Sequence, residues 1–237
     1  MDADLSTQTL PAYAINEAAK VMAMAFSDSP AYNFIFQGDA TYRLGALEWF
    51  FKRNLHLIQR RCPLALKGVL DIEGKVIACF LWTPSSHVKV STWDMIITAG
   101  LWQLPFKFGL ATLKRLLQTV GHIESGERDF FSASFSEGNS SDFIMLERMA
   151  IRPDFQGRGL GTKCLKSMII KTEDPIPIRL LTQEHRNVAF YKRLGFGVVG
   201  EMEMMSHNDR NDHGFTTLFT SWFMIREPPV GLPSDDS

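Results

Sequence analysis

The sequence has few cysteines and no pair of them at close spacing. Cys62, Cys79 and Cys164 stand far apart, so the sequence predicts neither a disulfide framework nor a metal site. Isolated thiols in odd number are typical of a reducing compartment. The first residues lack the basic start and apolar core of a signal peptide, and they lack the arginines of a transit peptide. We therefore expect a cytoplasmic protein.

Long apolar runs and a strong charge of either sign are also missing. No apolar run approaches the ~20 residues of a membrane helix, so no membrane partner is expected. The net charge is −1 over 237 residues, which argues against a nucleic-acid partner because phosphate binding needs a cationic surface. A chain of this length can bury a core without disulfides or metal. These absences leave an ordinary globular enzyme or binding protein.

The hydrophobic pattern predicts a single domain, residues 1–237. Apolar residues at helical spacing predict helices over 16–26 and 41–59. Two apolar runs flank the turn Asp-Ile-Glu-Gly-Lys and predict a β-hairpin over 64–84. A helical insertion over about 85–141 follows. The polar, proline-rich tail, about 227–237, is expected to be disordered.

Strands and helices alternate in the second half of the chain. The pattern predicts a buried strand over 143–151, and a helix over 186–196 that ends at Gly195. The other elements expected here are a helix over 160–172, a strand over 176–182, and two final strands over 197–205 and 215–225. This order predicts a layered, mixed α/β fold.

Three alternating glycines, Gly157, Gly159 and Gly161, lie between the predicted strand and the next helix. Glycine lets backbone N–H groups approach a ligand without obstruction by a Cβ. A helix N-terminus adds unpaired donors and a partial positive charge, so such a turn suits a phosphate. The stretch is not a P-loop, which ends in Gly-Lys-Ser/Thr, nor the dinucleotide fingerprint, which has glycine where Thr162 stands. An ordinary strand-to-helix turn is the alternative.

Residues 156–161, Gln-Gly-Arg-Gly-Leu-Gly, resemble the acetyl-CoA loop of the GNAT superfamily of N-acetyltransferases. A second motif is similar to a later helix of that superfamily, in which Asn begins the helix, Tyr follows and Gly-Phe ends it. Asn187, Tyr191, Gly195 and Phe196 stand at those positions. The segments AFSDSPAYNFIF and TSWFMIREP look like the puromycin N-acetyltransferase-like branch. The resemblance implies a mostly antiparallel central sheet, splayed at the cofactor site and flanked by helices, with acetyl-CoA as co-substrate.

The resemblance also implies which residues bind coenzyme A. Backbone N–H groups of residues 157–162 would hold the pyrophosphate, and the edge of residues 148–151 would pair with the pantetheine arm. An N–H near Met149 would polarise the acetyl carbonyl. Asn187 would bind the pantetheine or cap its own helix. The implied set is Met149, Ala150, Ile151, Gln156, Gly157, Arg158, Gly159, Leu160, Gly161, Thr162 and Asn187.

Two residues are candidates for proton transfer. The resemblance implies that Tyr191 protonates the departing thiolate of coenzyme A; the alternative is a core aromatic residue. Glu147 stands within an apolar strand, where a carboxylate needs a partner or a cavity. It is either the base that takes the proton of an acceptor amine or one half of a salt bridge. Strand alternation predicts that its side chain faces the same way as those of Met145 and Met149.

Together these features predict an acetyl-CoA-dependent N-acetyltransferase that acts in a ternary complex on a primary amine of a small molecule. Either a monomer or a homodimer is expected. Two alternatives stay open: a coenzyme A sensor without turnover, and an enzyme that acetylates protein N-termini or lysines. The aromatic residues of the insertion either pack on the domain or line the acceptor pocket. They are Trp93, Trp102, Phe106 and Phe108.

Overall fold

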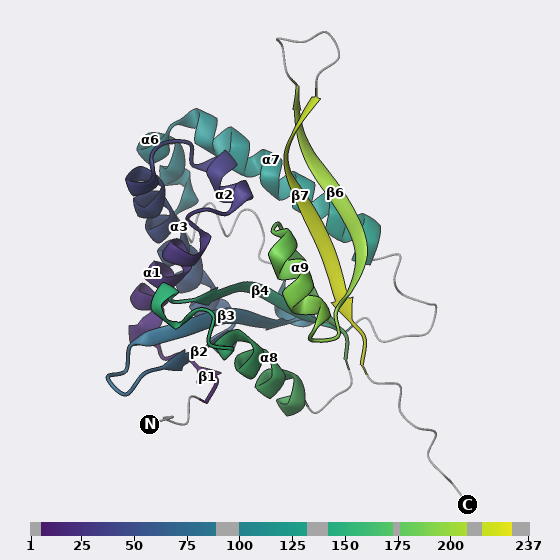
Figure 1. Ribbon diagram of the computed structural model, residues 1–237. Helices are drawn as coiled ribbons and strands as arrows, with labels where there is room; N and C mark the ends of the chain where they lie inside the picture. The colour runs from purple at the N-terminus through teal and green to yellow at the C-terminus, as the bar shows by residue number, and fades with distance from the viewer. Residues whose placement is uncertain (1–5, 89–99, 132–141, 173–175, 208–214, 229–237) are drawn as a thin grey trace, which may run out of the picture.

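A seven-stranded sheet forms the centre of the protein (Figure 1). The computed structural model describes residues 6–88, 100–131, 142–172, 176–207 and 215–228. The strand order is β1-β2-β3-β4-β5-β7-β6. Only β4 and β5 pair in parallel, and every other neighbouring pair is antiparallel. The strands are β1 (Gln8–Thr9), β2 (Leu66–Leu70), β3 (Val76–Pro84), β4 (Ile144–Ile151), β5 (Ile178–Thr182), β6 (Gly197–His207) and β7 (Phe215–Arg226). The predicted fold class, a mostly antiparallel mixed sheet flanked by helices, is confirmed.

Helices cover both faces of the sheet because alternate residues of the central strands are buried on opposite sides. Cys79 and Leu81 of β3 belong to one hydrophobic core, whereas Phe80 and Trp82 belong to the other. The first core packs under α1 (Ile15–Phe26) and α3 (Ala40–Arg61), together with residues of α6 (Leu104–Phe108) and α7 (Leu110–Gly126). The second packs under α8 (Leu160–Lys171) and α9 (His185–Lys192).

The shorter elements complete the described chain. They are the 3₁₀ turns η1 (Ala12–Ala14), η2 (Leu101–Gln103) and η4 (Pro153–Phe155), the helices α2 (Pro30–Ile35) and α4 (Ser85–Val88), and the π-helical turn η3 (Glu127–Phe131). In Figure 1 the β6–β7 hairpin extends beyond the rest of the sheet, and α7 runs beside it. Among the described residues, no helix combines the length and the apolar character that crossing a bilayer requires.

The elements predicted from periodicity are present, most of them with small shifts at their ends, but α9 ends at Lys192 and not at Gly195 as predicted. The periodicity did not predict α2, because its six residues make less than two helical turns. Pro30 is the first residue of α2, a position that proline favours because its missing N–H would have no partner there. The short strand β1 was missed as well. Trp93 and residues 229–237 of the predicted tail lie outside the described residues.

Candidate functional site

Strands β4 and β5 separate in the middle of the sheet. Their parallel ladder joins Ile144 to Ile178, Met145 to Arg179 and Leu146 to Leu180. Beyond Leu146, no ladder pair joins β4 to β5 in the described part of the chain. Residues 147–151 therefore have β3 as a neighbour on one edge only.

A β-bulge lies on β4 where this separation begins. Between two paired positions the register advances by two residues on β3, from Cys79 to Leu81, but by three on β4, from Ala150 to Glu147. Arg148, inside the bulge, has φ +55° and is the only non-glycine residue with positive φ in the described chain. An extra residue of this kind reverses the alternation of side chains along a strand.

The bulge overturns one prediction. Met145 and Glu147 line one cavity, whereas Met149 lines another. The three side chains therefore do not share a face, because regular alternation holds only as far as the extra residue.

The first cavity lies beside the glycine turn and has a volume of about 470 Å³. We call it the glycine-turn cavity. Most of the residues that the sequence singled out for cofactor binding line it, as does Tyr191. Those lining it are Met149, Ile151, Gln156, Gly157, Gly159, Leu160, Gly161, Thr162, Asn187 and Tyr191, with Ala25, Arg186, Phe190 and Arg193 in addition.

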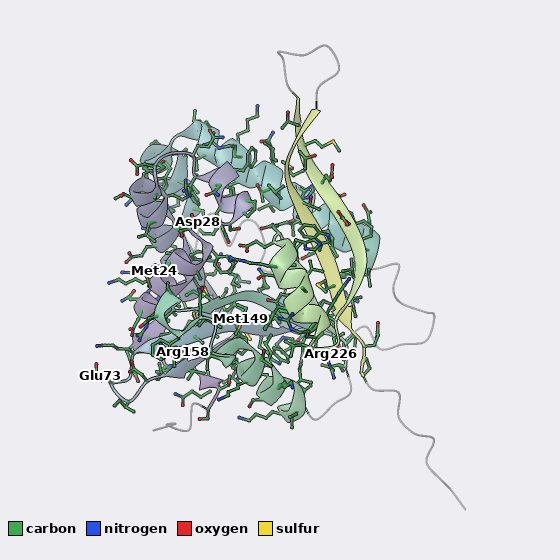
Figure 2. The ribbon with its side chains drawn as sticks, in the orientation of Figure 1. Met24, Asp28, Glu73, Met149, Arg158 and Arg226 are labelled. Carbon is green, nitrogen blue, oxygen red and sulfur yellow. The ribbon has the colours of Figure 1, made fainter. Side chains whose placement is uncertain are left out.

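Two of the predicted cofactor residues do not line this cavity. Ala150 is buried in the core under α1 and α3. The Arg158 guanidinium lies over the ring of Phe155, with its central carbon 5.3 Å from the ring centre. Figure 2 shows Met149 in the interior of the molecule and Arg158 nearer its edge. Two arginines that the sequence motifs did not indicate also line the cavity: Arg186 on α9 and Arg193 at its C-terminal end.

Two different structural requirements explain why glycines occupy this turn. Gly157 and Gly159 both have φ +74°, which favours glycine, and Gly159 is the N-cap of α8. At Gly161 the requirement is space, because a Cβ there would stand 3.1 Å from Cδ1 of Ile151. The side-chain amide of Gln156 donates to the Ile151 carbonyl at 2.9 Å and ties the turn to the end of β4. The first turn of α8 is thereby held along the cavity.

Tyr191 is both a core residue and a cavity residue. Only 8% of it is exposed, and its ring packs between those of Phe190 and Phe196. Burial raises the pKa of its hydroxyl above the ordinary value for tyrosine. The phenol therefore stays protonated at neutral pH, as a proton donor must.

A second cavity, of about 350 Å³, lies on the other side of the bulge. Glu127 and Glu147 both line it, and we call it the carboxylate cavity. Its other polar lining residues are Tyr32, Asn54, Thr119, Arg148 and Gln183. The remaining lining is apolar and comes mainly from α2, α3, α6, α7 and the ends of β4 and β5: Phe26, Ala31, Ile35, Phe50, Leu101, Trp102, Pro105, Leu113, Leu116, Leu117, Val120, Ile123, Met145, Leu146 and Leu181.

The sequence missed Glu127, which begins the π-helical turn after α7. Burial raises the pKa of its carboxyl to about 7, and the charges of Glu147 and Glu124 act in the same direction, whereas Arg179 opposes them. Such turns are frequent at functional sites. No periodic or motif signal marks Glu127 in the sequence, because its position depends on where α7 ends.

Close packing fixes the end of α7. A Cβ on Gly126 would stand 2.1 Å from Cζ of Phe223 on β7. Only glycine allows this approach without displacement of the helix or the ring. The residue next to it, Glu127, is thereby held at the carboxylate cavity.

Arg148 is bound on the α2–α3 side of the carboxylate cavity. Its Nη1 donates to Oδ1 of Asn54 at 2.6 Å, and its guanidinium also donates to the Tyr32 hydroxyl. Burial raises the pKa of Tyr32, and the charge of Arg148 partly opposes that rise. The guanidinium therefore already has two fixed partners.

The two cavities meet at adjacent residues of two elements. On β4, Glu147 and Arg148 line the carboxylate cavity and Met149 lines the glycine-turn cavity. At the end of α1, Phe26 lines the former and Ala25 the latter. The linings of the two cavities are therefore adjacent along the chain where β4 bulges.

The aromatic residues of the insertion serve different purposes. Trp102 lines the carboxylate cavity, although half of it is exposed. Phe108 packs against the rings of Phe36, Tyr42 and Trp49. Phe106 is 85% exposed and lines neither cavity. Phe108 therefore packs on the domain and Trp102 lines a cavity, whereas Phe106 stands at the surface.

Comparisons with known proteins agree with this architecture. Residues 118–198 match the sequence model of a family described as acetyltransferase (GNAT) domain. This range contains Glu127, Glu147, the glycine turn and Tyr191.

Several solved structures share the fold along nearly the whole chain. A protein from Corynebacterium glutamicum described as histone acetyltransferase HPA2 and related acetyltransferase is 16% identical, with a TM-score of 0.58 and coverage of 97% of this chain and 99% of that one. An agmatine N-acetyltransferase is 11% identical, with a TM-score of 0.59 and coverage of 95% and 100%. A polyamine N-acetyltransferase from Drosophila melanogaster is 12% identical, with a TM-score of 0.55 and coverage of 94% and 100%. Residues 118–198 thus resemble a GNAT acetyltransferase domain, and the chain shares its fold with these solved acetyltransferase structures.

Proposed function

We propose that this protein is an acetyl-CoA-dependent N-acetyltransferase that transfers the acetyl group directly to a primary amine of a small molecule. One observation carries the proposal. A cavity lined by the glycine turn and a protonated tyrosine meets a second cavity that contains two carboxylates. This is the arrangement that direct transfer between two bound ligands requires.

The glycine-turn cavity fits coenzyme A. At Gly157 and Gly159 no described atom lies within 4 Å of the place where a Cβ would stand, so an anion has room beside the backbone. The helix N-terminus of α8 and the side chains of Arg186 and Arg193 favour negative charge there. We propose that the members of the sequence-named set that line this cavity, together with these two arginines, bind the cofactor. When bound, acetyl-CoA supplies the activated acetyl group as a thioester.

Different side chains of the protein then accept and donate the protons of the reaction. The carboxylates of Glu147 and Glu127 take the proton that the amine nitrogen loses as it forms a bond to the acetyl carbon. The backbone N–H near Met149 stabilises the negative charge on the carbonyl oxygen. As the carbon–sulfur bond breaks, the hydroxyl of Tyr191 gives its proton to the sulfur. Burial raises the pKa of this phenol, and the same dry surroundings raise the proton affinity of the thiolate that it faces.

The size of the carboxylate cavity supports a small acceptor rather than a protein. Its volume of about 350 Å³ lies within the ordinary range for small-molecule sites. The agmatine and polyamine enzymes that share the fold act on small amines, as their names state. A protein substrate, suggested by the name of the histone acetyltransferase, and a coenzyme A sensor are the competing functions. The likeness to the puromycin N-acetyltransferase-like branch stays a prediction.

A calorimetric titration with acetyl-CoA tests the cofactor. We expect micromolar binding by the wild type and loss of binding by Gly159→Asp, which places a carboxylate at the proposed phosphate site. The matched control is Gly74→Asp in the β2–β3 turn, because Gly74 has φ +76° and equally open surroundings but lines neither cavity. The control should bind like the wild type. If folded wild-type protein does not bind acetyl-CoA, the proposal is wrong. If it binds but releases no free thiol with any amine, the sensor function replaces it.

A further inference from the structure

The charges that line the carboxylate cavity do not balance. Among the described lining residues, Glu127 and Glu147 are the only carboxylates and Arg148 is the only cation. Arg148 already donates to Asn54 on α3 and to Tyr32 on α2. One negative charge in excess remains.

The charges just outside the cavity do not change this balance. Glu124 and Arg179 act on Glu127 in opposite directions and line no part of the cavity. The Arg179 guanidinium lies against the rings of Phe131 and Phe143. The cavity can therefore neutralise a single ammonium group.

Among the described lining residues, no further carboxylate is present to pair with a second ammonium group. Its lining on α2, α3 and α7 is largely apolar and includes Ile35, Phe50, Leu116 and Val120. A charge buried without a partner is costly. An apolar group of similar size would instead gain from leaving water.

Resting on the function proposed above, we propose that the acceptor is a lipophilic monoamine. Its single ammonium group is received by Glu127 and Glu147 and gives one proton to one of these carboxylates, which frees the nitrogen lone pair for attack; the other carboxylate takes the proton that is lost as the new bond forms. Its aliphatic or aromatic body fills the cavity between α2, α3 and α7. Polyamines and other polycations are selected against. Glu127 and the apolar lining set this specificity, whereas the glycine turn and Tyr191 serve any acceptor.

Hexylamine and 1,6-diaminohexane form a matched pair of probes, because they have the same carbon chain and differ by one ammonium group. Thiol release with saturating acetyl-CoA gives kcat/KM for each. At neutral pH we expect hexylamine and 2-phenylethylamine to exceed 1,6-diaminohexane by about 100-fold or more. Equal or better turnover of the diamine would overturn the proposal, as would failure of both monoamines in protein that binds acetyl-CoA. Failure to bind acetyl-CoA would instead remove the proposed function itself.

A carboxylate introduced into the apolar part of the lining should shift the substrate preference from the monoamine towards the diamine. Leu117→Asp is suitable because Leu117 lines the cavity but is half exposed, so the fold should tolerate the change. We expect the ratio of kcat/KM for the diamine to that for hexylamine to rise about tenfold. Leu110→Asp is the control, since Leu110 lies on the same helix, is 74% exposed and does not line the cavity. Isothermal titration of both amines in the presence of coenzyme A should show the same shift in affinity. An unchanged ratio in Leu117→Asp would count against the proposed occupant.

Discussion

Glu127, at the end of α7, and Glu147, on β4, line the same largely apolar cavity from two different elements of the fold. Burial raises the pKa of Glu127 to about 7, and the negative charge of Glu147 adds to that rise. A carboxyl group with a pKa near neutrality can exchange a proton easily at physiological pH. The pair is therefore suited to accept the proton of an amine.

The first prediction concerns the pH dependence of turnover. Glu127 must be ionised to receive an ammonium group, so kcat/KM for hexylamine should rise with pH through an inflection near 7. In Glu127→Gln this inflection should disappear, and kcat/KM above pH 7 should fall by about 10²-fold. Asp129→Asn, in the same π-helical turn but exposed, should retain the wild-type profile. An inflection that persists in Glu127→Gln would assign it to another group.

The raised pKa of Glu127 predicts how the free energy of unfolding depends on pH. A carboxyl whose pKa rises from 4.5 to about 7 on folding favours the folded state below pH 4.5, and this contribution is lost as the pH rises through 7. Glutamine resembles the protonated form at every pH. In urea unfolding at pH 8, Glu127→Gln should therefore be more stable than the wild type by about 1–3 kcal/mol. The difference should vanish near pH 4.5; equal stabilities at pH 8 would contradict the raised pKa.

Gly126 provides a test of how Glu127 is positioned. Its substitution by alanine forces a Cβ against the Phe223 ring, so the free energy of unfolding should fall by about 1–3 kcal/mol. Displacement of the helix end should also lower turnover. At Gly121, on the same helix, no atom beyond the adjoining helix backbone lies within 4 Å of the place where a Cβ would stand. Gly121→Ala should therefore raise the free energy of unfolding by up to about 1 kcal/mol. Similar effects of the two substitutions would show that the contact with Phe223 is unimportant.

Tyr191→Phe separates the two interpretations of this residue. The ring is kept, so packing against Phe190 and Phe196 and the melting temperature should change little. If the hydroxyl protonates the thiolate, kcat should fall by about 10²-fold while acetyl-CoA still binds in the titration. Tyr13→Phe, at an exposed position, serves as the control. Wild-type kcat in Tyr191→Phe would leave the tyrosine with a packing role alone.

Local signals in the sequence were sufficient for much of the fold and for one cavity. Alternating glycines before a helix and the spacing of Asn187 and Tyr191 are short-range patterns, and the residues concerned line one cavity in the structure. The bulge at Arg148 could not be predicted, because an extra residue in one strand is visible only against its partner strand. Glu127 could not be predicted either, since its burial depends on the contact between Gly126 and Phe223, 97 residues apart in the numbering.

The extra residue in β4 affects how substitutions can change the specificity of such a protein. Met145 and Glu147, before Arg148, line the carboxylate cavity, whereas Met149 and Ile151, after it, line the glycine-turn cavity. If donor and acceptor occupy these cavities as proposed, one strand holds two independent sets of specificity determinants. Substitutions at Met145 or Glu147 can then alter the choice of acceptor while the donor site stays intact. Deletion of a single residue at the bulge would restore regular alternation along β4. The two sets of determinants would then no longer face separate cavities, and both would be lost.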